Sequence, residues 1–110
     1  MNESETIEEE VYHFGETTFC YNNNELRTRS SRVLITSRQA DILRLLAKNI
    51  GNVVSKEMIQ EAVWGTVSYA NSLAVNVQMT YLRHALQHDA TVKIESLKKK
   101  GYVLTLLSEV

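Results

Sequence analysis

The order of the hydrophobic patterns constrains the fold of this chain most: three patterns with helical spacing precede two with strand character. Apolar residues recur every three or four positions over residues 36–48, 55–65 and 72–88. The last part of the chain holds two apolar runs, Val92 to Leu97 and Tyr102 to Leu106. A turn of three lysines and a glycine joins these runs, so we expect a β-hairpin with a cationic tip.

Polar residues at the starts of these patterns fix the predicted helix limits. Thr36 and Gln39 have the spacing of a capping box, and Ser55 is placed to cap the second helix. We predict a third helix from about Ser72 to His88, after a connection over residues 66–71. The predicted buried stripes are Ile42, Leu43, Leu46 and Ala47, then Met58, Ile59, Ala62 and Val63, and finally Val75, Met79, Leu82 and Leu86.

The first third of the chain has a different composition. Residues 1–10 are polar and acidic, and we expect a flexible arm there, followed by one folded domain over residues 11–110. Short runs of β-branched, aromatic and aliphatic residues, separated by Gly15 and by three consecutive asparagines, then predict a small antiparallel sheet. The predicted strands are Val11 to Phe14, Thr18 to Tyr21, Glu25 to Arg29 and Val33 to Ile35.

Charge is distributed unevenly along the chain. Residues 1–25 contain seven glutamates and no Lys or Arg, whereas residues 26–110 contain all 12 basic residues and six acidic ones. The net charge of -1 is therefore the sum of an acidic front, residues 1–25, and a basic body, residues 26–110. The chain has no signal peptide pattern and no apolar run long enough to span a membrane. With a single cysteine, we expect a cytoplasmic chain, membrane-anchored only if the native protein continues past residue 110.

Three helices, the last two joined by a short connection, followed by a β-hairpin, make a winged helix-turn-helix. Several motifs in this order resemble those of the OmpR/PhoB-type effector domain, and the Asn71-Ser72-Leu73 entry to the third helix is closer to the ToxR/CadC-type branch. The resembling stretches are Thr36-Ser37-Arg38-Gln39, Val53-Val54-Ser55-Lys56-Glu57, Ala62-Val63-Trp64-Gly65, Leu82-Arg83-His84-Ala85-Leu86 and Lys100-Gly101-Tyr102.

The resemblance implies an α+β fold with a four-stranded N-terminal sheet, three helices and a C-terminal hairpin wing. It also implies a regulator that binds promoter DNA, and a connection, here residues 66–71, that in relatives contacts RNA polymerase. This chain departs from the pattern on its third helix, where Thr80 and Tyr81 stand in place of arginines, so we expect weak binding by a monomer. At the wing, Lys99 replaces a glycine, which removes a residue that takes a positive φ cheaply.

The candidate DNA-binding residues lie on the third helix and at the wing. Asn76 is suited to adenine and Val77 to a thymine methyl group, Arg83 to phosphate, and Lys98 to the minor groove. The alternatives are a surface salt bridge for Arg83 and plain solubilising charge for Lys99 and Lys100. The full predicted set is Asn71, Ser72, Ala74, Asn76, Val77, Gln78, Thr80, Tyr81, Arg83, His84, Lys98, Lys99 and Lys100.

The sequence offers no case for an enzyme, a cofactor or a metal site. His84 and His88 have helical spacing, but no second cysteine or third histidine stands nearby in the sequence. The competing hypothesis is a winged helix that binds protein as a co-regulator, which the weakly basic third helix and the acidic arm support. A homodimer or a partner regulator is then expected to supply control.

Overall fold

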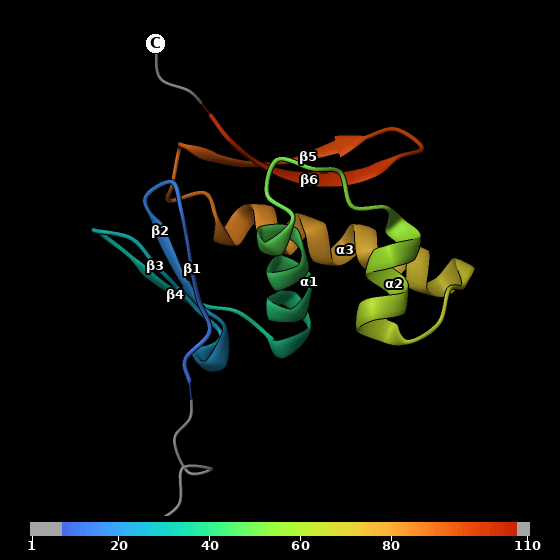
Figure 1. Ribbon diagram of the computed structural model, residues 1–110, viewed down its shortest axis with the longest axis horizontal. Helices are drawn as coiled ribbons and strands as arrows, with labels where there is room; N and C mark the ends of the chain where they lie inside the picture. The colour runs from blue at the N-terminus through green and yellow to red at the C-terminus, as the bar shows by residue number, and fades with distance from the viewer. Residues whose placement is uncertain (1–7, 108–110) are drawn as a thin grey trace, which may run out of the picture.

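The structure is a computed structural model that describes residues 8–107, with a sheet, three helices and a hairpin (Figure 1). The sheet has the antiparallel strand order β1-β2-β3-β4, and β5 pairs with β6 in the hairpin. This architecture confirms the predicted winged helix-turn-helix. The elements are β1 (Val11–Phe14), β2 (Thr17–Cys20), the 3-10 turn η2 (Tyr21–Asn23), β3 (Glu25–Arg27), β4 (Arg32–Leu34), α1 (Ser37–Lys48), α2 (Lys56–Trp64), α3 (Tyr69–Ala85), β5 (Val92–Leu97) and β6 (Gly101–Leu106).

The register of the N-terminal sheet places one row of apolar residues on the same face. Phe19 pairs with Tyr12 on β1 and with Leu26 on β3, and the Tyr12 and Phe19 rings stack with centroids 5.8 Å apart. Side chains directly opposite each other in a sheet share a face. The sheet therefore presents a continuous apolar surface to the helices, in which Phe19 and Leu26 are buried.

A buried carboxylate fastens this sheet to the chain between α3 and β5. Asp89 accepts hydrogen bonds from the Glu16 amide and the Thr17 hydroxyl, both at 2.7 Å, and from the Thr91 amide at 2.9 Å and hydroxyl at 2.5 Å. Burial acts to raise the pKa of Asp89, but these hydrogen bonds outweigh it, so the pKa lies below its ordinary value. The carboxylate is therefore a charged link between the β1–β2 turn and the start of the hairpin.

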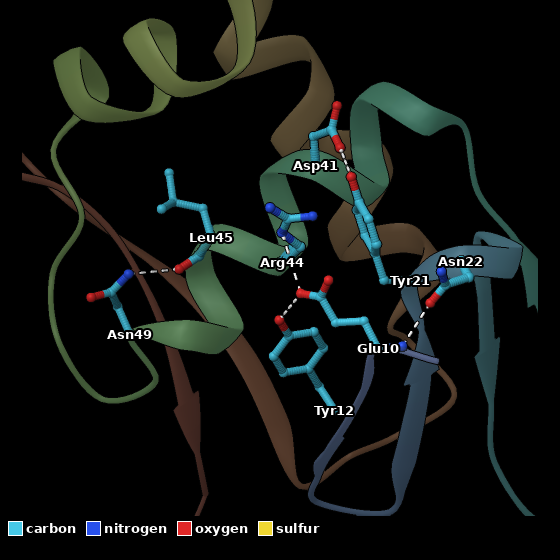
Figure 2. A network of polar contacts seen from close by, with 8 residues as sticks. All are labelled: Glu10, Tyr12, Tyr21, Asn22, Asp41, Arg44, Leu45 and Asn49. Atoms are coloured by element: carbon cyan, nitrogen blue, oxygen red, sulfur yellow. Dashed lines mark hydrogen bonds and ion pairs between the residues drawn. The ribbon is translucent and has the colours of Figure 1, made fainter. Parts of the chain in front are cut away.

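A second polar network joins the sheet to α1 (Figure 2). The Arg44 guanidinium lies 4.4 Å from the centre of the Tyr21 ring and 3.4 Å from the Glu10 carboxylate, which also accepts from the Tyr12 hydroxyl. Burial and this bond to Glu10 raise the pKa of Tyr12 to about 12. Glu10 falls within the predicted arm, yet these contacts and a hydrogen bond from the Tyr21 amide hold it to the domain.

The same network connects η2 to the helix. The Tyr21 hydroxyl donates to the Asp41 carboxylate at 2.6 Å, and this bond is the main cause of a raised pKa of Tyr21. Residues 1–7 of the predicted arm lie outside the described residues.

The core lies between the three helices, the hairpin and the inner face of the sheet. The Thr36 capping box is present, and Ser55 caps α2 as predicted. The predicted apolar stripe of α3 is buried over its whole length, as is that of α1 except for half-buried Ala47. Core residues include Phe14, Phe19, Leu26, Ile42, Leu43, Leu46, Val54, Ile59, Val75, Met79, Leu82, Leu86, Ile94, Tyr102 and Leu104.

The predicted limits of the third helix were wrong at both ends. The helix begins at Tyr69 because the Ser68 hydroxyl accepts a hydrogen bond from the Asn71 amide. The Ser68 backbone amide in turn donates a hydrogen bond to the Gln60 side-chain oxygen at 3.0 Å. The helix ends at Ala85, since the chain turns to bring Asp89 into its buried site. The connection between α2 and α3 is therefore residues 65–68, shorter than predicted.

The predicted buried face of α2 was also partly wrong. Met58 is 49% exposed and Ala62 is exposed, whereas Gln60 is buried. The side-chain carbonyl of Gln60 accepts a hydrogen bond from the Ser68 amide, which allows this polar residue to be buried. The spacing of apolar residues had instead predicted that Met58 and Ala62 are buried.

The loop between α1 and α2 is joined to the hairpin by a single antiparallel β-bridge. Val54 and Tyr102 exchange two backbone hydrogen bonds of 2.8 and 2.9 Å, and the Gly51 amide donates to Leu104 at 2.8 Å. These bonds fix the hairpin against the helices. Within the described residues, no helix is long and apolar enough to cross a membrane.

Candidate nucleic-acid interface

The outward side of α3 carries a row of exposed apolar side chains. Tyr69, Leu73, Val77 and Tyr81 follow one another at intervals of four residues, and their exposed fractions are 81%, 47%, 50% and 56%. We call these four residues the apolar stripe. Because residues four apart lie on neighbouring turns of a helix, the stripe runs along most of α3. Asn76, Thr80, Arg83 and His84 are the exposed polar residues beside it.

Three side chains join α3 to the hairpin, and we call Asn76, Arg83 and Tyr102 the wing brace. The Tyr102 hydroxyl donates to Asn76 Oδ1 at 2.8 Å, and Arg83 Nε donates to the Ile94 carbonyl at 3.0 Å. The Arg83 guanidinium also lies 5.8 Å from the centre of the Tyr102 ring. The brace therefore sets the position of the hairpin relative to α3 from two points along the helix.

The hairpin ends in the wing lysines, Lys98, Lys99 and Lys100, all of them exposed. Lys99 adopts a φ of 66°, the left-handed conformation that a glycine takes at little cost. A residue with a Cβ adopts this conformation at a cost of about 1–2 kcal/mol, so Lys99 is a strained position of the wing. A concavity of about 250 Å³ lies between these lysines, Asn76 of α3, and Lys56 at the start of α2.

Gly101 allows the wing to approach the α1–α2 loop. Its φ is +140°, and a Cβ there would lie 2.1 Å from the Val54 carbonyl oxygen. No side chain fits this position without separating the backbones of Val54 and Tyr102. Gly101 therefore decides where the wing lysines are held.

The structure brings most of the predicted site residues to one surface. Asn76, Val77, Thr80, Tyr81, Arg83 and His84 are exposed on α3, and the wing lysines border the concavity beside Asn76. Arg83 bonds a backbone carbonyl of the hairpin instead of a neighbouring carboxylate.

The remaining predicted residues lie toward the flanks of the helix. Asn71, Ser72, Ala74 and Gln78 are half-buried. The Asn71 side chain donates to the Thr66 carbonyl at 3.0 Å, and Gln78 accepts from Gln39 of α1 at 3.2 Å. Two of the four thus use their side chains inside the domain.

Sequence reasoning missed two members of the apolar stripe, Tyr69 and Leu73. A helix that starts at Ser72 leaves Tyr69 in the connection, whereas a cap at Ser68 includes it. Leu73 lies inside the predicted helix, and the spacing of four from Tyr69 to Tyr81 is the signal in the sequence that places both residues in one row.

Possible metal ligands do not gather in residues 8–107, where no group of three His, Cys, Asp or Glu side chains is placed to hold an ion. Because α3 ends at Ala85, His84 and His88 do not share a helix face.

Comparison with known families gives this interface its context. The family model described as "Transcriptional regulatory protein, C terminal" matches residues 30–104, which include all three helices, β5 and the first four residues of β6. The chain belongs to this family. Its members are transcriptional regulators and not enzymes, which confirms the predicted class and the predicted resemblance to OmpR/PhoB-type domains.

Individual proteins are similar to this chain in sequence or in fold. Transcriptional regulatory protein RprY of Bacteroides fragilis is 26% identical over 97 residues, which cover 88% of this chain and 41% of RprY. This chain thus spans less than half of that relative. The DNA-binding domain of E. coli CadC has the same fold, with a TM-score of 0.77, 23% identity, and coverage of 90% of this chain and 95% of the CadC domain.

A further structure with this fold was solved as a complex. The Klebsiella pneumoniae RstA DNA-binding domain, in complex with the RstA box, has a TM-score of 0.75 and 22% identity to this family member. The match covers 87% of this chain and 97% of the RstA domain, so the similarity extends over nearly the whole described fold.

Proposed function

We propose that this domain is a sequence-specific transcriptional regulator that binds double-stranded promoter DNA through α3 and the wing. The observation that carries the proposal is the placement of the exposed side of α3 next to the wing lysines, with the wing brace between them. In this arrangement α3 enters the major groove, whose width of about 12 Å admits a helix. The wing lysines then contact the adjacent backbone and minor groove. Such a role places this domain in the cytoplasm of a bacterium.

Salt dependence tests this proposal, because each phosphate contact steepens the fall of log affinity with log salt by about 0.9. The wild-type chain is titrated onto random and genomic duplexes at several salt concentrations, beside Lys98→Ala/Lys100→Ala. We expect salt-sensitive binding by the wild type and a slope shallower by about 1.8 in the variant.

A matched control removes the same charge elsewhere. Arg29 and Lys48 are exposed and belong to the β3–β4 turn and to the end of α1. Arg29→Ala/Lys48→Ala should keep the wild-type slope. No binding by the wild type at low salt, or equal slopes for both double variants, would contradict the proposal.

The competing function is a protein-interaction module, and the exposure of the apolar stripe favours it. An apolar protein interface depends little on salt, so a stable complex that does not weaken between low and high salt would support this alternative. We regard DNA as the better partner because the wing lysines border a concavity beside Asn76, which lies on α3 next to the stripe residue Val77.

Regulation through other proteins forms part of the proposal. Val67, in the connection between α2 and α3, is 47% exposed and is offered as a contact with RNA polymerase. Val67→Asp should reduce transcription in a purified system while leaving the affinity for DNA unchanged. Association with a second copy or a partner regulator is expected to strengthen binding to DNA, which sedimentation in the presence of duplex measures.

The acidic front of the chain is proposed to compete with DNA for the basic body. Replacing Glu3, Glu5, Glu8 and Glu9 with Gln should tighten binding at low salt and have little effect at high salt. Glu10 is kept in this variant because it is paired with Arg44. Unchanged affinity at low salt would remove the competition from the proposal.

A further inference from the structure

The cations of α3 are confined to its C-terminal end. Between Tyr69 and Leu82 the helix has no Lys or Arg, and Arg83 donates its Nε proton to the Ile94 carbonyl. Guanine is read in the major groove mainly by Arg or Lys, which donate to its O6 and N7 atoms. Recognition helices place their N-terminal residues against base edges. The part of α3 best placed for base contacts therefore has no group of the type that selects guanine.

Two polar side chains of this face, Asn76 and Thr80, already make hydrogen bonds within the domain. Asn76 needs both its oxygen and its nitrogen for a bidentate contact with adenine, but Oδ1 accepts from Tyr102 at 2.8 Å. The Thr80 hydroxyl donates to the Asn76 backbone carbonyl at 3.2 Å. Hydrogen-bond readout by these two residues would require both contacts to break.

What remains on this face is the apolar stripe. The thymine C5-methyl group is the one apolar group that a base pair presents in the major groove. We infer that the apolar stripe reads thymine methyl groups, so that the DNA recognised by this domain is rich in A·T pairs. This inference rests on the proposed function and specifies its substrate.

The surroundings of the stripe favour DNA over a second copy of the chain. Lys56 and the wing lysines border the concavity beside Asn76, on the wing side of α3. A major groove at thymines has methyl groups on its floor and phosphates along both rims. An apolar row with cations beside it is complementary to that surface, whereas a second copy would bring another set of the same lysines.

Deoxyuridine provides the direct test, because it differs from thymidine only in lacking the C5-methyl group. Duplexes are selected from a random pool at fixed salt, and the selected duplex is synthesised with thymidine and with deoxyuridine. Burying one methyl-sized group corresponds to about a fourfold change in affinity, so two or three contacts predict a loss of roughly 16- to 64-fold. The salt slope should not change, because no phosphate contact is removed.

Variants assign the effect to the stripe. Val77 is half-exposed, so Val77→Ala leaves the core intact and should reduce the preference for thymidine by about fourfold. Leu34 on β4 is 68% exposed and lies on the N-terminal sheet, and Leu34→Ala should keep the full preference.

The outcomes separate this inference from the proposed function. Salt-sensitive binding with equal affinity for the two duplexes, or selection of G·C-rich sequences, overturns the methyl readout and leaves DNA binding in place. Absence of salt-sensitive binding overturns the proposed function itself. A dimer in free solution that Val77→Ala dissociates would assign the stripe to a second copy.

Discussion

Substituting Gly101 with Ala should detach the wing from the helices. The new Cβ would lie 2.1 Å from the Val54 carbonyl oxygen and 2.8 Å from Ser55 Cα, both of them backbone atoms. Separation of the two segments would break both hydrogen bonds between Val54 and Tyr102. Each contributes about 1 kcal/mol, and the positive φ adds about 1–2 kcal/mol for a residue with a Cβ.

The expected loss in the free energy of unfolding is therefore about 3–4 kcal/mol. Gly51 supplies the control, because its φ is +83° but a Cβ there has nothing within 4 Å. Gly51→Ala should cost only the conformational term of about 1–2 kcal/mol.

Urea unfolding of the two variants and the wild type measures both losses. The difference of about 2 kcal/mol corresponds to a melting temperature roughly 8–16 °C lower for Gly101→Ala than for Gly51→Ala. Equal losses in the two variants would refute the reasoning, because the close approach of Gly101 to Val54 would then have no energetic effect.

Four further substitutions test the wing and its supports. Lys99→Gly should raise the unfolding free energy by about 0.5–1 kcal/mol in a thermal melt by relieving the left-handed strain, whereas Lys98→Gly should lower it. Asp89→Asn should cost about 2 kcal/mol in urea unfolding at neutral pH, because an amide cannot accept the same set of donors. Tyr102→Phe removes the bond to Asn76 and should cost about 1 kcal/mol and weaken DNA binding without changing its salt slope.

The Asp89 prediction has a defined pH dependence. The folded pKa lies below the ordinary value of 3.8, so the carboxylate stabilises the fold fully above that pH. Its contribution is lost as the pH falls through the folded pKa, and the wild type should converge on Asp89→Asn there. A stability difference between the wild type and Asp89→Asn that stays constant in acid would contradict this prediction. A loss of stability in Lys99→Gly would contradict the prediction for that variant. Unaltered stability and DNA affinity in Tyr102→Phe would contradict the prediction made for it.

The sequence predicted those parts of the fold that depend on local chemistry. The Thr36 capping box and the buried residues Val75, Met79 and Leu82 follow from neighbours within one or two helical turns. The start of α3 does not, because Ser68 and Ser72 are both suitable caps. The bond from the Ser68 amide to buried Gln60 decides between them, and it exists only once α2 and α3 are packed.

The same limit applies to the candidate site. Lys98 to Lys100 could be placed at a wing from the sequence, because a hairpin turn is local. The hydrogen bond between Asn76 and Tyr102 joins residues that are 26 positions apart, and it depends on where the hairpin lies. The sequence therefore does not predict that Asn76 Oδ1 accepts a hydrogen bond within the domain. Base readout by Asn76 therefore stays a prediction from residue type alone.

In the proposed mode of DNA binding, affinity and selectivity come from different elements of the domain, and this makes the wing brace important for both. The wing lysines supply charge but carry no sequence information, since phosphates are the same at every base pair. The apolar stripe distinguishes bases but contributes little attraction at a distance, because apolar contacts act only when water is excluded. Simultaneous contact requires the wing and α3 to be held at a fixed separation, and Asn76, Arg83 and Tyr102 provide that connection. The contacts of these three residues within the domain are therefore proposed to determine whether the two contributions add.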